Sequence, residues 1–182
     1  MMYMKKLFLI LLALFISGCH HKSSAVEEVE KFLNNYICLS NDVIKNLNDV
    51  IDSNEDFNKK HKKLYKKIMT KQYQNLKYTI LSEKIDKDIA LINVSISVYD
   101  LTKAEDEATN YLSKNLKEFY NDNDEFDNSK YISYKLKLMH ECNDRVDYQI
   151  TFSLKKVDNE WILEQPTNDD LEKIHGIYLN GS

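Results

Sequence analysis

Glycine and proline are nearly absent from this chain, which has three glycines and one proline in 182 residues. Phosphate-binding loops, dinucleotide-binding turns and nucleophile elbows all need glycine at fixed positions, because the backbone there takes a positive φ or passes close to a ligand. The glycines stand only at Gly18, Gly176 and Gly181. Their scarcity excludes the common nucleotide-binding motifs.

Signals for metals and disulfides are also missing. The histidines show no HxH or HExxH spacing, so no metal and no other cofactor is predicted. The acidic stretch 121–130 lacks the central glycine and the closing glutamate of a calcium loop. Cys38 falls on the polar face of a predicted helix and Cys142 on the apolar side of a predicted strand. Both are therefore expected to be free thiols.

The charge balance excludes a further class of protein, the nucleic-acid binders. Arg145 is the only arginine, and the net charge is −4. Loss of residues 1–18 would remove two lysines and no acids, which takes the charge to about −6. A nucleic-acid binder needs a net positive charge or a concentrated basic face, so no nucleic acid is expected as a partner.

The N-terminus carries the most specific signal. Two lysines precede the apolar run Leu7–Phe15, which is too short to span a bilayer but suits a signal peptide. Ile16-Ser17-Gly18-Cys19 follows and resembles the bacterial lipobox, in which cleavage before the cysteine leaves it acylated. Gly18 and Cys19 would flank the cleavage site. An ordinary secreted protein and an N-terminal membrane anchor are the alternatives.

This motif divides the chain into three parts. Residues 1–18 form the signal peptide, residues 19–24 a tether and residues 25–182 a single α+β domain. The lipid on Cys19 would hold the domain to the membrane, at the outer face of the bacterial plasma membrane. Two acyl chains suffice for stable attachment.

Hydrophobic periodicity predicts the elements of the domain. Apolar residues keep one helical face over 25–51, with a break near Ser40-Asn41. The full series is helices over 25–51 and 57–68, strands over 78–85 and 89–99, a helix that begins at 100–102, strands over 131–142, 146–156 and 161–163, and a helix over 168–179.

Helices packed on a curved antiparallel sheet form an α+β domain, with the N-terminal and central helices against the sheet. The order of elements resembles the nuclear-transport-factor-2-like (cystatin-like) fold. The segments that carry the resemblance are 64–68, 76–80 and 153–163. They are similar to those of small Gram-positive lipoproteins of unknown function that carry such a domain. The resemblance implies no catalytic residue.

A non-catalytic domain that binds an unknown small molecule or protein is the function that these features favour. A concave sheet closed by helices would form a pocket, and tyrosine suits a pocket wall because it offers apolar area and one polar group. The candidate wall residues are Tyr99, Tyr111, Tyr134, Tyr148 and His140.

Two other functions remain open. An isomerase or cyclase would place a base in an apolar cavity, with Asp100 and His140 as candidates. Asp100 also suits the N-cap of a helix. An immunity or exclusion lipoprotein against a toxin or phage factor would use an exposed surface, such as the acidic stretch from Asp122 to Asp127.

Overall fold

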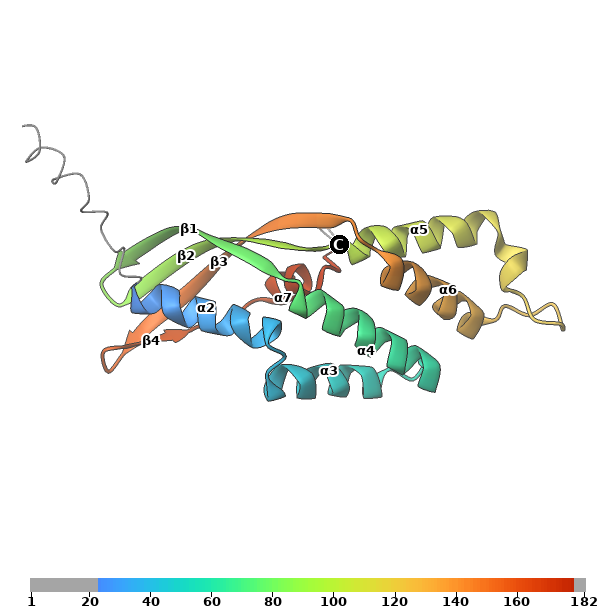
Figure 1. Cartoon of the computed structure of the whole chain (residues 1–182), viewed down its shortest axis with the longest axis horizontal. Coiled ribbons are helices and arrows are strands. Elements are labelled where there is room, and N and C mark those ends of the chain that lie inside the picture. Colours follow the sequence, from blue (N-terminus) through green and yellow to red (C-terminus); the bar gives the residue numbers. More distant parts are fainter. Residues whose placement is uncertain (1–22, 179–182) are drawn as a thin grey trace, which may run out of the picture.

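Six α-helices, a short 3-10 helix and four strands make up residues 23–178, the part of the chain that the computed structural model describes (Figure 1). The predicted signal peptide, Cys19 and most of the tether lie outside these residues. The helices are α2 (Ser24–Ile37), α3 (Asn41–Ser53), α4 (Lys59–Gln74), α5 (Leu101–Lys114), the 3-10 helix η2 (Leu116–Phe119), α6 (Asn128–Glu141) and α7 (Asn168–His175). The strands are β1 (Lys77–Asp86), β2 (Ile89–Tyr99), β3 (Arg145–Val157) and β4 (Glu160–Leu163).

The strands form one open antiparallel sheet in the order β1-β2-β3-β4. Tight turns set its register: β1 and β2 meet at Asp86 and Ile89, and β3 and β4 at Val157 and Glu160. Asp158 and Asn159, between the latter two, both have positive φ, which matches the twist of a two-residue hairpin. The domain is therefore α+β, as predicted.

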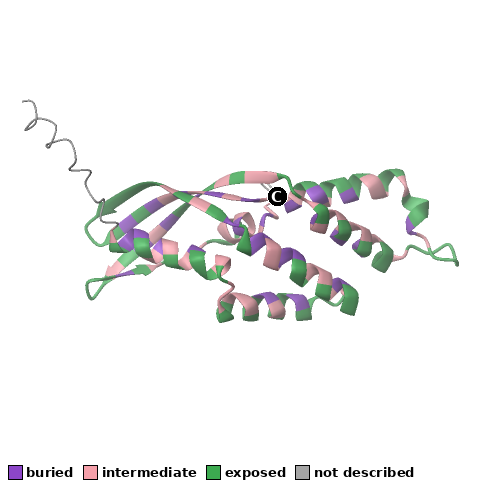
Figure 2. Cartoon of the chain, in the orientation of Figure 1, coloured by how far each residue is buried: buried purple, intermediate pink, exposed green. Residues whose placement is uncertain are grey.

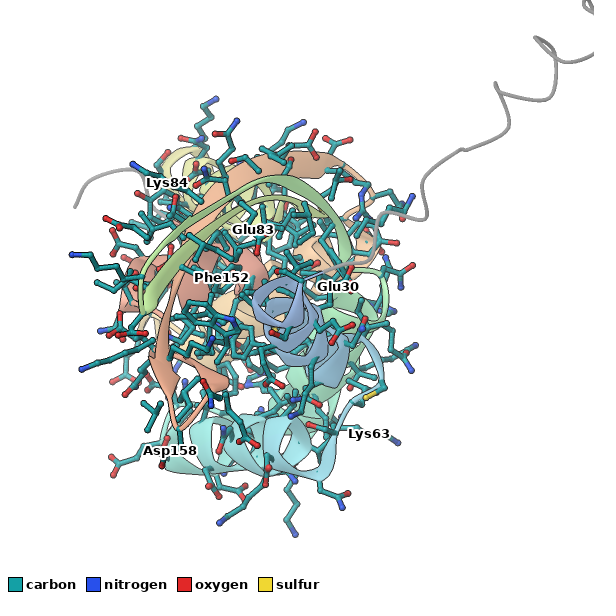
Figure 3. All side chains as sticks on the ribbon, turned by 90° about the vertical axis from the view of Figure 1, so that its left-hand side faces the viewer. Glu30, Lys63, Glu83, Lys84, Phe152 and Asp158 are labelled. Atoms are coloured by element: carbon teal, nitrogen blue, oxygen red, sulfur yellow. The ribbon has the colours of Figure 1, made fainter. Side chains whose placement is uncertain are left out.

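One face of the sheet is buried against α2 and α7, over which it curves (Figures 1 and 3). Alternate residues of β2 from Ala90 to Val98 are fully buried, and Phe152 of β3 packs edge-to-face on Phe32 of α2. The opposite face is open, and its central part is polar. On it, Asn93 donates to Ser82 and accepts from Thr151, which links three strands. We call the sheet with α2 and α7 the sheet half.

The helices α3, α4, α5 and α6 pack into a second core beside the sheet, so the central helices do not cover the sheet as predicted (Figure 2). We call these four helices the helical half. Its buried residues include Leu47, Met69, Leu101 and Leu136. No helix within residues 23–178 combines the length and the apolar character that crossing a bilayer requires.

The single helix predicted over 25–51 is two helices, α2 and α3, which separate at the interruption considered near Ser40-Asn41. Leu39, at φ 56°, separates α2 from α3, and the side chain of Ser40 caps α3 by accepting from the N–H of Val43. The chain turns here and lays α3 along α4 (Figure 1).

The predicted strand over 131–142 is wrong, because this segment is the helix α6. Asp127 caps α6 by accepting from the N–H of Lys130, and buried Ile132, Leu136 and Met139 follow a helical spacing. The alternation of apolar residues over 132–138 fits a strand as well, but packing against α4 and α5 decides for the helix. Consequently two strands, not three, follow the central helices.

Candidate functional site

An apolar cleft with aromatic walls lies between the end of α2 and the helices α3, α4 and α7. Its volume is about 240 Å³, slightly below the usual range of small-molecule pockets. The lining residues are Tyr36, Val43, Asn46, Leu47, Val50, Tyr65, Met69, Tyr73, Leu171 and His175. We call this hollow the aromatic cleft.

Three rings pack together in its wall. The rings of Tyr36 and Tyr73 meet edge-to-face with centroids 5.1 Å apart, and the imidazole of His175 lies 5.6 Å from Tyr73 and 6.3 Å from Tyr36. Rings in such contact stabilise each other and hold a fixed geometry. The wall of the cleft is therefore rigid and largely apolar.

The cleft favours uncharged groups. Burial lowers the pKa of His175 to about 4, so its imidazole is neutral at neutral pH. Burial also raises the pKa of Tyr36 and of Tyr65. It raises that of Tyr73 further, with Tyr36 and Tyr65 adding to the effect. All four side chains are thus neutral, and a charged ligand would gain no partner of opposite charge from them.

The same side chains keep free hydrogen-bonding capacity. Among residues 23–178, no group bonds to the hydroxyls of Tyr36, Tyr65 or Tyr73, or to the imidazole of His175. These atoms all keep contact with solvent. The lining can therefore offer a molecule in the cleft both ring surface and hydrogen bonds.

Gln72 fixes the position of this wall. Its side chain is buried and bonds to two elements: Nε2 donates to the carbonyls of Tyr99 and His175 at 3.0 and 2.9 Å, and Oε1 accepts from the N–H of Tyr99 at 2.9 Å. We call these three bonds the Gln72 clamp. Gly176, at φ 72°, ends α7 beside it, where an added Cβ would lie 2.0 Å from Gln72 Nε2. The clamp joins α4 to β2 and α7.

The residues predicted as pocket wall lie elsewhere. Tyr111 stacks on Tyr134, with centroids 4.8 Å apart, at the far end of α5 and α6. Tyr148 packs on Tyr178, and Tyr99 lies under Lys71 and Arg145 at the end of β2. None of these tyrosines lines the aromatic cleft.

His140 and Asp100 are likewise outside the cleft. His140 is in the last turn of α6, not in a strand, with Nε2 3.4 Å from Lys67 Nζ and its buried Nδ1 without a partner among the described residues. Asp100 caps α5 by accepting from the N–H of Lys103. Cys142, which we placed in the same strand as His140, ends α6 as its C-cap and is half-buried. Both it and Cys38 are free thiols, as predicted.

His61 and Ser133 form a close pair between α4 and α6, with Nε2 and Oγ 2.8 Å apart. The Ser133 hydroxyl donates to the carbonyl of Ser129, and Asn58 Nδ2, which can only donate, also lies 3.3 Å from His61 Nε2. These contacts tie the start of α4 to α6. Among residues 23–178 no cluster of three or more acidic, histidine or cysteine side chains forms a metal site.

The sequence contains a signal for most of the cleft wall. Tyr65, Met69 and Tyr73 recur every four residues on one face of α4, and Tyr36 ends the apolar face of α2. No sequence motif marks His175. Its proximity to the tyrosines depends on α7 returning to α4, which the sequence pattern does not predict.

Comparisons with known proteins yield a distant structural match and no sequence match. No family model matches the chain, and no curated protein sequence matches it. One solved structure resembles it: a protein (ycdA) from Bacillus subtilis subsp. subtilis str. 168, provisionally described as a lipoprotein. The TM-score is 0.38 and the identity 15%, over 68% of this chain and 39% of that one. The chain thus spans about two fifths of that protein, and a likeness this distant supports no argument about function.

Proposed function

We propose that this chain is a lipoprotein, held through Cys19 at the outer face of the bacterial plasma membrane, whose domain binds a small uncharged molecule in the aromatic cleft without catalysis. The observation that carries the binding role is the cleft itself. It combines packed rings, a neutral imidazole and hydroxyls without partners among the described residues in a space of about 240 Å³. Such a lining suits a ligand with one apolar ring or short chain and a single polar group.

Anchoring is supported by the lipobox-like sequence that ends in Cys19. Replacing Cys19 with serine should prevent lipid attachment and lipobox-dependent cleavage, since the acylated thiol is lost. Fractionation of bacterial cells should then find no lipid on the chain. A Cys19→Ser chain that still carried lipid and stayed on the membrane like the wild type would refute the anchor.

The ligand site can be tested with a neutral fluorescent ring compound, 1-aminoanthracene, and the unlipidated chain. Its emission should rise and shift to the blue on binding. Val43→Trp fills the cleft from α3 and should abolish the signal, whereas Lys45→Trp, on the exposed face of the same helix, should leave it intact. Equal binding by all three chains would place the dye elsewhere and refute the proposed site.

Kinship with the nuclear-transport-factor-2-like lipoproteins is part of this proposal. It rests on the segments 64–68, 76–80 and 153–163, of which the last forms the β3–β4 hairpin. An experimental structure that superimposes on that fold through all four strands would support it.

An immunity or exclusion role is the second candidate. The loop from Asn121 to Asp127 is acidic and exposed, and Phe126 beside its acids is 44% exposed. An apolar ring among carboxylates suits a basic peptide. Deletion of the gene would then sensitise cells to a toxin or phage that the wild type survives. The isomerase alternative gains no support from Asp100 or His140, because neither lines the aromatic cleft.

A further inference from the structure

Exposed apolar side chains gather at one end of the domain. Among residues 23–178, nine large hydrophobic side chains are exposed, and six of them lie in two hairpins. Their exposed fractions run from 37 to 54%. The six are Leu81, Ile85, Ile89, Leu91, Val157 and Ile162. We call residues 83–91 and 155–162, which hold five of these six, the hairpin end.

Part of this set lies grouped around Lys155 on the open face of the sheet. Ile89 lies opposite Lys155, which lies opposite Ile162, so these three form one row across β2, β3 and β4. Leu91 begins the next row, between Lys84 and Ser153. Farther along the same face the residues are polar, as the linked Ser82, Asn93 and Thr151 show. This apolar group is therefore confined to the hairpin end.

The chain enters the domain at this same end. The helix α2 begins at Ser24, and the hydroxyl of Ser23 donates to the carboxylate of Glu83 in β1. Figure 3 looks onto this end: Glu83 lies toward the start of α2, Lys84 points outward and Asp158 marks the tip of the other hairpin. Only residues 20–22 separate Cys19 from Ser23, so the reach from the lipid-bearing residue to Ser23 is about 14 Å at full extension.

Given the anchor proposed above, on which this step rests, the hairpin end must stay close to the lipid head groups. Exposed aliphatic side chains grouped in this way suit an interaction site, and a short tether keeps their local concentration at the membrane high. We infer that the hairpin end is a membrane-contact surface, which sets its aliphatic side chains into the boundary between head groups and acyl chains.

The charges at this end set the character of the contact. Lys84, Lys87, Lys155 and Lys156 stand among Glu83, Asp86, Asp88, Asp158 and Glu160. These charges nearly cancel, so attraction to anionic lipids contributes little. The long lysine side chains can still extend toward the head groups while Ile89 and Ile162 face the lipid. Burial of the aliphatic side chains should drive the contact, which should therefore not weaken at high salt. The domain then stands with its helical half directed away from the bilayer (Figure 1).

The test uses the lipidated chain, reconstituted in phosphatidylcholine vesicles, with Cys38 and Cys142 replaced by serine. A polarity-sensitive nitrobenzoxadiazole dye is attached at Ile162→Cys or, as the control, at Leu116→Cys. Leu116 is a matched site because it is also an exposed aliphatic residue, at 46% against 52% for Ile162, but lies in η2. The label at 162 should emit at shorter wavelength and be quenched by spin-labelled lipids, at low and high salt alike. The label at 116 should show neither effect.

Adding Ile89→Asp to the 162-labelled chain should abolish quenching while the chain stays on the vesicles. If the chain is lipidated and vesicle-bound but the two labels are quenched equally, or not at all, the contact surface is refuted and the anchor stands. A blue shift at 162 without lipid quenching would indicate a protein contact, such as a second copy, and would also overturn the inference. Absence of lipid on Cys19 would overturn both proposals.

Discussion

The sheet half and the helical half are packed in different ways. In the sheet half, the inward residues of β2 are all fully buried and are all aliphatic. The helical half has a polar residue, His61, inside its core, and its Tyr65 is only half-buried beside the aromatic cleft. Dry aliphatic packing fixes the shape of a domain, whereas exposed ring faces and hydroxyls without partners leave capacity for a ligand. The comparison indicates that the aliphatic core of the sheet half is the scaffold. The binding site lies at the boundary of the two halves, where α2 and α7 face α3 and α4.

The Gln72 clamp joins the two halves, and breaking it should have the largest effect. Gln72→Leu would leave the N–H of Tyr99 and two carbonyls without their bonds in a buried position, at a cost of about 4 kcal/mol in the free energy of unfolding. Urea unfolding measures this cost. Gln74→Leu, on the exposed side of the same helix, is the control and should cost almost nothing. Similar costs for the two variants would show that the clamp does not join the halves.

Truncation of one aliphatic side chain in each half tests the difference in packing. Ile96→Ala in β2 should cost about 4 kcal/mol, because rigid strands cannot close the cavity, and Leu136→Ala in α6 about 2 kcal/mol, because helices can shift. Both side chains are buried, at 0 and 1% exposure. Urea unfolding of both variants gives the comparison. A larger cost for Leu136→Ala would reverse the assignment of the rigid half.

The sheet half was largely predictable from sequence. The alternation over β2 predicts Ile89–Tyr99, as observed, and the turn at Asp158-Asn159 places the last hairpin. Period-two burial on one face leaves a clear pattern, and short turns leave little choice of register.

The helical half was less predictable. Residues 132–138 satisfy a strand pattern and a helix pattern at once, and only contacts with α4 and α5 settle the outcome. The cleft is less predictable still, since His175 and Tyr36 lie far apart in the chain and meet only in the folded domain. Tertiary contacts of this kind leave no periodic trace in a single sequence.

The neutral imidazole in the cleft predicts a pH dependence. Because burial lowers the pKa of His175 from 6.5 to about 4, the unfolded chain takes up this proton first as the pH falls. The contribution of the neutral His175 to the free energy of unfolding is fully present above pH 6.5. It should fall by up to about 1.4 kcal/mol per pH unit toward pH 4. The His175→Gln variant should lack this part of the change in unfolding free energy with pH. Identical slopes for the two chains in urea unfolding would show that His175 is not desolvated.

The smallest effect concerns a turn in the sheet half. Asn159 has φ 68°, a conformation that glycine adopts without strain. Asn159→Gly should therefore raise the free energy of unfolding by about 0.5 kcal/mol. Thermal unfolding would detect the rise in Tm. A fall in Tm would indicate that the side chain of Asn159 supports the hairpin.

The most direct test of the binding site is native mass spectrometry of the chain, purified from the cells that make it. The account predicts a reproducible small-molecule adduct on the wild type, which is absent from Val43→Trp and present on Lys45→Trp. An adduct that persists on Val43→Trp, or a bare mass for the wild type, would contradict a ligand site in the aromatic cleft.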